Sequence, residues 1–186
     1  SQKSQSGIFA LHHPAQEIPN TKSQTQHQSN RQSDLIENIR AKTLKVISSP
    51  NDRRELKDLL LSEQTTKVLQ ELLVDDSLLY PKQFRKRLHA LDLLYEGLKF
   101  SDPMVRTAYL EIANRFISRA PSNEVLTNKT LATQFQGDRV ELALIMVTLD
   151  RSNQTNFENE LKSRSLSART YFKKAKQLSK IYQVAL

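Results

Sequence analysis

The sequence predicts an all-α protein, a single helical bundle of six to eight helices that follows a disordered N-terminal tail. From residue 34 onward, apolar residues recur at three- and four-residue spacings, which is typical of helices with one buried face. No stretch alternates apolar and polar residues over the length of a strand, and three glycines leave little turn chemistry for hairpins. We therefore divide the chain into a tail, residues 1–33, and a bundle domain, residues 34–186.

The tail differs from the rest of the chain in composition. Residues 1–33 contain six Ser and seven Gln and almost no periodic apolar pattern. Such a segment cannot bury enough apolar surface to offset the entropy lost on ordering, so we expect it to be disordered. Its one apolar patch, from Ile8 to Leu11, is either part of an unstructured leader or a short docking peptide.

Three helices are expected in the first part of the bundle domain. Ser33 or Asp34 is expected to cap the first helix, and the Ser-Pro-Asn sequence at residues 49–51 is expected to end it. Asn51 is expected to cap the second helix, and the third follows Ser62. The apolar positions that support these helices are Leu35, Ile36, Ile39, Leu44, Leu56, Leu59, Leu60, Val68, Leu69, Leu72 and Leu73.

Prolines and a glycine mark the next boundaries. Pro81 suits the first turn of a long helix, and Asp102-Pro103 starts another that ends before Pro121. Gly137 is expected to be the C-cap of a short helix over residues 130–136.

The helix predicted for residues 138–150 has apolar residues on nearly every side. A helix without a polar face belongs in the centre of a bundle, so we expect its large side chains to form the middle of the core. These residues are Leu142, Leu144, Ile145 and Val147.

The positive charge is concentrated at the C-terminal end. The whole chain carries a net charge of +8, and residues 162–186 contribute seven Lys or Arg and no Asp or Glu. Residues 34–161 carry 18 basic and 19 acidic groups, and the tail adds +2. This asymmetry indicates a polyanionic partner, such as a nucleic acid, or another acidic surface.

A helix over the C-terminal segment separates its cations from its apolar residues. Arg169, Lys173, Lys176 and Lys180 fall within about 60° of one another, forming what we call the cation stripe. The opposite side is expected to dock on the bundle and carries Ala168, Tyr171, Ala175, Leu178 and Tyr182. A solvated lysine face is the alternative, although such faces usually contain acidic residues as well.

Residues 157–182 resemble a helix-turn-helix DNA-binding motif. The run RSLSARTYFKKAKQL, residues 164–178, is similar to the turn and second helix of that motif. The resemblance implies that Ser167 caps the second helix and faces a phosphate, that Arg169, Thr170 and Lys173 face the major groove, and that Tyr171 holds the second helix on the first. The complete set of candidate nucleic-acid-binding residues is Lys162, Arg164, Ser167, Arg169, Thr170, Lys173, Lys176 and Lys180.

Residue patterns on which enzymes depend are missing from the sequence. The absence of Cys removes thiol catalysis and Cys-based zinc sites, and three isolated glycines do not form a phosphate-binding loop. Three of the four His lie in the tail, and His89 is expected at the surface of a helix. We expect no enzymatic activity, no metal and no cofactor.

The expected function is therefore that of a nucleic-acid-binding regulatory or accessory protein, with DNA preferred over RNA. The alternative is a helical interaction adaptor that binds an acidic protein surface, because the Ser/Gln-rich leader resembles in composition those of type III secretion substrates and regulators. Membrane-surface binding is a third possibility, disfavoured because the bundle needs the apolar face. The longest apolar run is too short to span a bilayer, and no signal peptide opens the sequence, which predicts a cytoplasmic location. The sequence indicates no oligomeric state.

Overall fold

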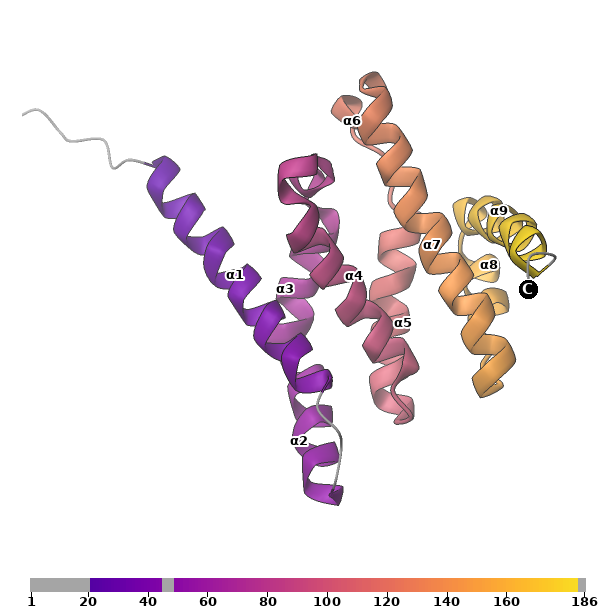
Figure 1. The fold of residues 1–186 in the computed structure, drawn as a ribbon, viewed down its shortest axis with the longest axis horizontal. Coiled ribbons are helices and arrows are strands. Elements are labelled where there is room, and N and C mark those ends of the chain that lie inside the picture. Colours follow the sequence, from indigo (N-terminus) through magenta and orange to yellow (C-terminus); the bar gives the residue numbers. More distant parts are fainter. Residues whose placement is uncertain (1–20, 45–48, 184–186) are drawn as a thin grey trace, which may run out of the picture.

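The computed structural model describes residues 21–44 and 49–183, and every regular element in these ranges is helical (Figure 1). The expected all-α fold is confirmed, although the described residues form nine α-helices instead of six to eight. In chain order the elements are α1 (Thr21–Thr43), α2 (Pro50–Leu61), α3 (Glu63–Val74), the 3-10 helices η1 (Asp76–Leu79) and η2 (Pro81–Gln83), α4 (Phe84–Lys99), α5 (Pro103–Ser118), α6 (Asn123–Thr127), α7 (Lys129–Asn153), α8 (Phe157–Arg164) and α9 (Leu166–Gln183).

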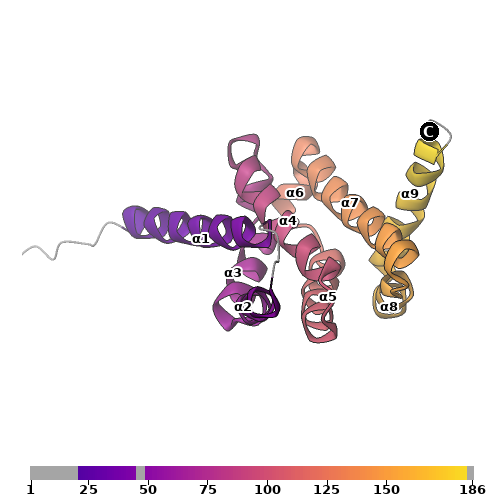
Figure 2. The ribbon, with the colours of Figure 1, turned by 60° about the horizontal axis from the view of Figure 1, so that its bottom comes forward.

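The helices are arranged in a row. Helix α1 lies at one end, α4 and α5 lie in the middle, and α7, α8 and α9 lie toward the other end, where α8 and α9 contact both α7 and α5 (Figure 1 and Figure 2). Helix α4 packs against α1, α3, α5 and α7, whereas α9 packs mainly against α7. Helix α9 is therefore a terminal member of the row. Among the described helices, none combines the length and apolarity that a bilayer span requires.

Side-chain caps fix where several helices begin. Ser49 caps α2: its Oγ accepts a hydrogen bond from the Asp52 N–H at 3.1 Å, and its own N–H donates to Asp52 Oδ2 at 2.9 Å. This reciprocal pair explains why Ser49, and not the predicted Asn51, is the cap, since Pro50 then occupies the first helical position. The predicted starts at Ser62 and Asp102 are confirmed, because both side chains accept hydrogen bonds from backbone N–H groups of the first turn.

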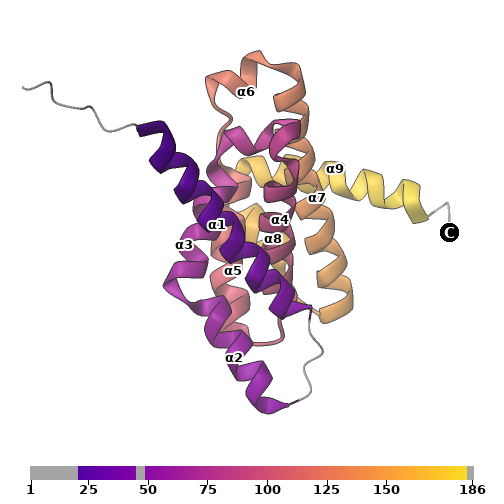
Figure 3. The same ribbon diagram turned by 60° about the vertical axis from the view of Figure 1, so that its left-hand side comes forward.

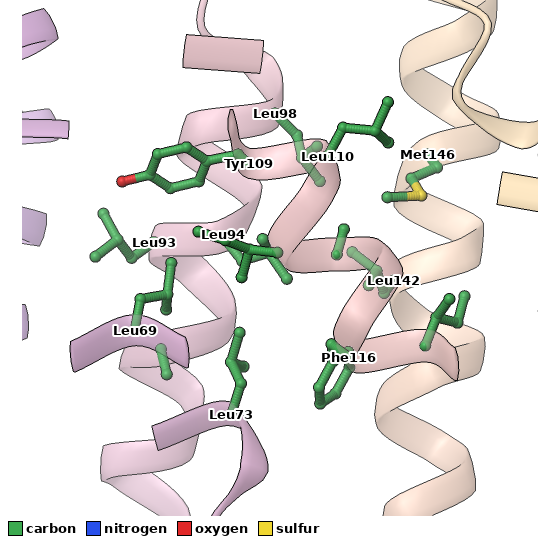
Figure 4. Packing of buried hydrophobic residues seen from close by; sticks show 14 of the residues in the cluster. Leu69, Leu73, Leu93, Leu94, Leu98, Tyr109, Leu110, Phe116, Leu142 and Met146 are labelled. Carbon is green, nitrogen blue, oxygen red and sulfur yellow. The ribbon is translucent and has the colours of Figure 1, made fainter. Parts of the chain in front are cut away.

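Helices α3, α4, α5 and α7 form the middle of the main core (Figure 4), to which α1, α2, α8 and α9 also contribute buried residues. Leu94 of α4 and Tyr109 of α5 are fully buried, and the Tyr109 hydroxyl donates to the Leu60 carbonyl at 3.1 Å. Gly97 lies directly beneath the Tyr109 ring, where a Cβ atom would overlap the ring carbons. A glycine at this position lets α5 approach α4 closely.

Two predicted boundaries differ in the structure. Helix α1 begins at Thr21, earlier than expected, while residues 1–20 of the predicted tail lie outside the described residues. Gln is a good helix former, so a helix that is docked through Ile36 and Ile39 extends back through the Gln-rich segment. Gly137 does not end a helix: α7 runs through it from Lys129 to Asn153, because burial on both sides of one glycine outweighs its weak propensity.

The centre of α7 is rotated relative to the prediction. Leu142 and Val147 are buried as expected, but Leu144 and Ile145 are only half-buried, and Met146 takes the most enclosed position. Helix α7 has α4 on one side and α8 and α9 on the other, so part of its surface stays open despite its apolar composition.

Candidate nucleic-acid interface

The turn between α7 and α8 is held by one carboxylate. Gln154 adopts a left-handed backbone conformation with φ of 52°, which ends α7. Asp150 then accepts three hydrogen bonds, from Thr155 Oγ1 at 2.7 Å, from the Phe157 N–H at 2.8 Å and from the Glu158 N–H at 2.9 Å. A carboxylate on these N–H groups satisfies donors that the first turn of a helix leaves free. Asp150 therefore fixes the position of α8 on α7.

A single residue, Ser165, separates α8 from α9. Its N–H donates to the Leu161 carbonyl at 3.0 Å, and its Oγ accepts from the Ala168 N–H at 3.3 Å. Ser165, and not the predicted Ser167, is thus the cap of α9, and Ser167 is exposed in the first turn. The connection is shorter than the three to four residues usual in a helix-turn-helix motif.

Helix α9 docks through a face centred on Phe172. Ala168, Phe172 and Ala175 are buried, and Tyr171 is half-buried against the main core. Sequence reasoning identified the two alanines and Tyr171 but missed Phe172, although its spacing from both alanines is helical. Leu178 was expected on this face and is 39 % exposed. The side chain of Tyr182, also expected there, lies outside the described residues.

Leu178 is exposed because α9 extends past the ends of the helices on which it docks. Its first half crosses α7, and its C-terminal half extends beyond the rest of the molecule (Figure 3). Ile181, on this extension, is 65 % exposed. The end of α9 is accordingly accessible from several directions.

Besides Ser167 and Lys176, four predicted interface residues are exposed on α9. Arg169, Thr170, Lys173 and Lys180 are all exposed. Arg169 Nε donates to the Lys162 carbonyl at 3.1 Å, which orients its guanidinium along the α8–α9 junction. Within residues 21–44 and 49–183, neither Lys173 nor Lys180 forms an ion pair with an acidic side chain.

The other three predicted cations are paired with acids from neighbouring helices. Lys162 Nζ and Lys176 Nζ both contact Glu158 Oε1, at 3.0 Å and 2.7 Å. Arg164 pairs with Glu111 of α5 and lies 4.0 Å from Glu160. The segment that carries the cation stripe contains no acidic residue, but Glu158 of α8 lies in contact with Lys176 of the stripe.

The local environment keeps Glu158 ionised. Burial alone would raise the pKa of this carboxyl, but hydrogen bonds from Lys176 and Lys162 outweigh burial and hold the pKa below its ordinary value. With two ammonium groups on one carboxylate, one positive charge is left over. Residues 157–183 contain seven basic and two acidic side chains, which gives this segment a net charge of +5.

A second charged cluster lies in the interior and has a different character. Arg87 Nε is 3.2 Å from Asp138 Oδ2, and Arg139 stacks on the rings of Phe116 and Phe135. Burial lowers the pKa of Arg139 to about 10. The enclosed space beside these groups is about 10 Å³, the size of one water molecule, so this cluster has no room for a substrate.

Two further predictions concern His89 and metal binding. His89, expected at the surface, is buried, because it lies on the side of α4 that faces the core. No group of three or more His, Asp or Glu in the described part of the chain is placed to hold a metal ion. No protein-family model, curated protein or solved structure matches this chain. Its function is therefore inferred from its own surfaces.

Proposed function

We propose that the protein is a non-enzymatic, nucleic-acid-binding regulatory or accessory protein and that α9 is the helix that contacts the nucleic acid. One observation carries the proposal: the helix that extends beyond the others contains five Lys or Arg and no Asp or Glu (Figure 3). Phosphates attract such a surface because each contact releases condensed counterions. The proposed location is the cytoplasm.

The dimensions of α9 suit duplex DNA. An α-helix with its side chains is about 10–12 Å wide, close to the roughly 12 Å width of the major groove of B-DNA. Arg169 and Lys180 are separated by about 16 Å along the helix axis, the length of about five base-pair steps. The major groove of A-form RNA is narrow and deep, so DNA is the preferred partner.

The proposed roles follow from exposure. Arg169, Thr170 and Lys173 lie in the first turns of α9 and are the candidates for contact with base edges. Lys180 and Ser167 are candidates for phosphate contact, as are Lys162, Arg164 and Lys176 if they exchange their present carboxylate partners for phosphates. Helix-turn-helix recognition of particular bases is a further hypothesis, because the one-residue link at Ser165 departs from the usual turn.

Charge reversal of Lys173 and Lys180 tests the proposal. Lys173→Glu with Lys180→Glu should abolish binding to a labelled DNA duplex in about 50 mM salt, where electrostatic attraction is strong. The melting temperature should stay nearly unchanged, because both side chains are exposed.

A matched control uses exposed lysines elsewhere. Lys67→Glu with Lys129→Glu changes the net charge equally but lies on α3 and at the start of α7. It should weaken binding far less. Equal weakening by the two double variants would show that α9 is not the contact surface, and an unmodified protein that does not bind DNA would refute the proposed function.

The exposed apolar residues of α9 favour a second candidate function, that of an interaction adaptor. Leu178 and Ile181 lie beside lysines on the extended half of α9, a combination that suits an amphipathic helix with an acidic rim. Co-purification with and without nuclease separates the two functions. Partners that are lost after nuclease treatment support nucleic-acid binding, whereas protein partners that persist support the adaptor.

A further inference from the structure

The carboxylate of Glu158 lies between two lysines of the proposed interface. It accepts a hydrogen bond from Lys162 Nζ at 3.0 Å, and Lys176 Nζ lies 2.7 Å away. The first lysine belongs to the same helix as Glu158, and the second comes from α9. Two ammonium groups that converge on one acidic oxygen form the arrangement by which lysines hold a phosphate oxygen.

Glu158 is the more firmly held member of this trio. Its N–H donates to Asp150, and its neighbour Phe157 is buried, so the backbone at this point is anchored to α7. The side chain of Glu158 is 14 % exposed, whereas those of Lys162 and Lys176 are 37 % and 48 % exposed. Lysine has a long, flexible side chain and exchanges partners readily. Both ammonium groups are therefore able to turn toward an incoming anion while Glu158 stays in place.

We propose that Glu158 is an internal competitor of the nucleic acid: it occupies a phosphate position between Lys162 and Lys176 and lowers the affinity of the interface. This inference rests on the proposed function. A phosphate that approaches either lysine must displace the carboxylate or tolerate its negative charge nearby. Among the predicted contact cations, only Arg169, Lys173 and Lys180 then contact phosphates without such competition.

The inference makes a quantitative statement about salt dependence. Three free cations give a slope of log affinity against log salt of about −2.7 on duplex DNA. Release of Lys162 and Lys176 raises the number of contacts to five and the slope to about −4.5. Glu158→Gln removes the charge of the competitor and keeps the shape of the side chain, so it should produce this change.

Glu160→Gln is the matched control. Glu160 lies on the same helix, two residues away, and its substitution changes the net charge by the same amount. In the structure it lies only near Arg164, at 4.0 Å, and touches neither Lys162 nor Lys176. Any general effect of removing one acid from α8 appears equally in both variants.

The experiment measures the dissociation constant of a DNA duplex at several salt concentrations for the unmodified protein and both variants. Glu158→Gln should bind at least about fivefold more tightly than Glu160→Gln in 50 mM salt, the scale of one partly exposed ion pair, and about two-hundredfold more tightly if the slope reaches about −4.5 and both proteins bind equally at 1 M salt. Adding Lys176→Gln to Glu158→Gln should remove most of the gain, which ties it to the released lysine.

The outcomes separate the two ideas. If Glu158→Gln gains no more than Glu160→Gln while the unmodified protein binds, the competitor role is wrong and the proposed function stands. If only Glu158→Gln binds, the carboxylate blocks the lysines as inferred, but the unmodified protein does not bind DNA and the proposed function is refuted. If no protein binds, the proposed function is wrong and the inference falls with it.

Discussion

Gly97 and Gly137 both lie inside helices, but their surroundings are opposite. The ring of Tyr109 covers Gly97, whereas no neighbouring atom lies within 4 Å of the place where a Cβ would stand on Gly137. Glycine weakens a helix interior by about 1 kcal/mol relative to alanine, because its unfolded state is more flexible. The same substitution should therefore act in opposite directions at the two sites.

Gly137→Ala should raise the free energy of unfolding by about 0.4–1 kcal/mol, since it adds helix propensity without a clash. Gly97→Ala should lower it by about 1–3 kcal/mol, since Tyr109 and the backbone must move. Urea denaturation followed by circular dichroism measures both values. A loss of stability in Gly137→Ala would mean that α7 is not continuous at this residue.

Asp76 makes the stability of the fold depend on pH. Burial raises the pKa of this carboxyl, but hydrogen bonds from Arg119 and Ser122 and the charge of Arg119 outweigh burial, so the pKa is below its ordinary value. Arg119 holds both carboxylate oxygens, at 2.8 Å and 3.0 Å. A carboxyl whose pKa is lowered in the folded state stabilises the protein above its unfolded pKa, and this contribution is lost as the pH falls through the folded value.

The melting temperature of the unmodified protein should therefore fall between about pH 5 and pH 3, near and below the ordinary pKa of Asp. Asp76→Asn should be less stable at pH 7 and should show a smaller fall over the same range. Asp102 and Glu158 also have lowered pKa values, so part of the acid dependence should remain in the variant. Parallel curves for the two proteins would contradict the role of Asp76.

At the scale of the element, the orientation of α7 determines which of its apolar residues are buried in the core. Met146 is fully buried and Ile145 is only half-buried, although they are adjacent and similar in hydrophobicity. Met146→Ala should lower the free energy of unfolding by about 2–5 kcal/mol, as is usual for large-to-small substitutions in a core. Ile145→Ala should lower it clearly less. Chemical denaturation of both variants would show whether the helix is rotated as described, and a larger effect at Ile145 would contradict it.

Element types and several boundaries follow from local sequence, whereas their exceptions depend on distant residues. Ser62 and Asp102 are caps that the sequence identifies, because a cap bonds to N–H groups only a few residues away. Gly137 is a local helix breaker, and only packing from other helices keeps α7 continuous through it. His89 is polar in a polar run, and only the fold shows that it faces the core.

The candidate site shows the same division. The cation stripe on α9 follows from helical periodicity, and the exposure of Arg169, Lys173 and Lys180 is as expected. The pairing of Lys176 with Glu158 and of Arg164 with Glu111 could not be predicted, because it depends on how α8, α9 and α5 meet. Charge counts along a chain record which cations exist but not which are already neutralised.

At the scale of the whole molecule, the middle of the core and the proposed interface lie in different parts of the row of helices. Helix α4 has neighbours on several sides and lies in the middle, whereas α1 and α9 lie at opposite ends (Figure 2). The terminal position leaves Leu178 and Ile181 exposed on the extended half of α9, although the sequence analysis placed Leu178 on the face that docks on the bundle. The separation also means that substitutions of the exposed cations and substitutions of the core are expected to have independent effects.

The terminal position of α9 also sets the free energies at which different parts of the chain open. The C-terminal half of α9 extends beyond the other helices (Figure 3), so we expect its amide hydrogens to exchange through partial openings, whereas those of α4, which has neighbours on several sides, should exchange only through global unfolding. A polyanion that binds closed α9 then lowers the population in which this end is open, and it stabilises the protein against global unfolding by the same free energy, because neither the open nor the unfolded state keeps the site. Binding and local order are thus linked through the same helix.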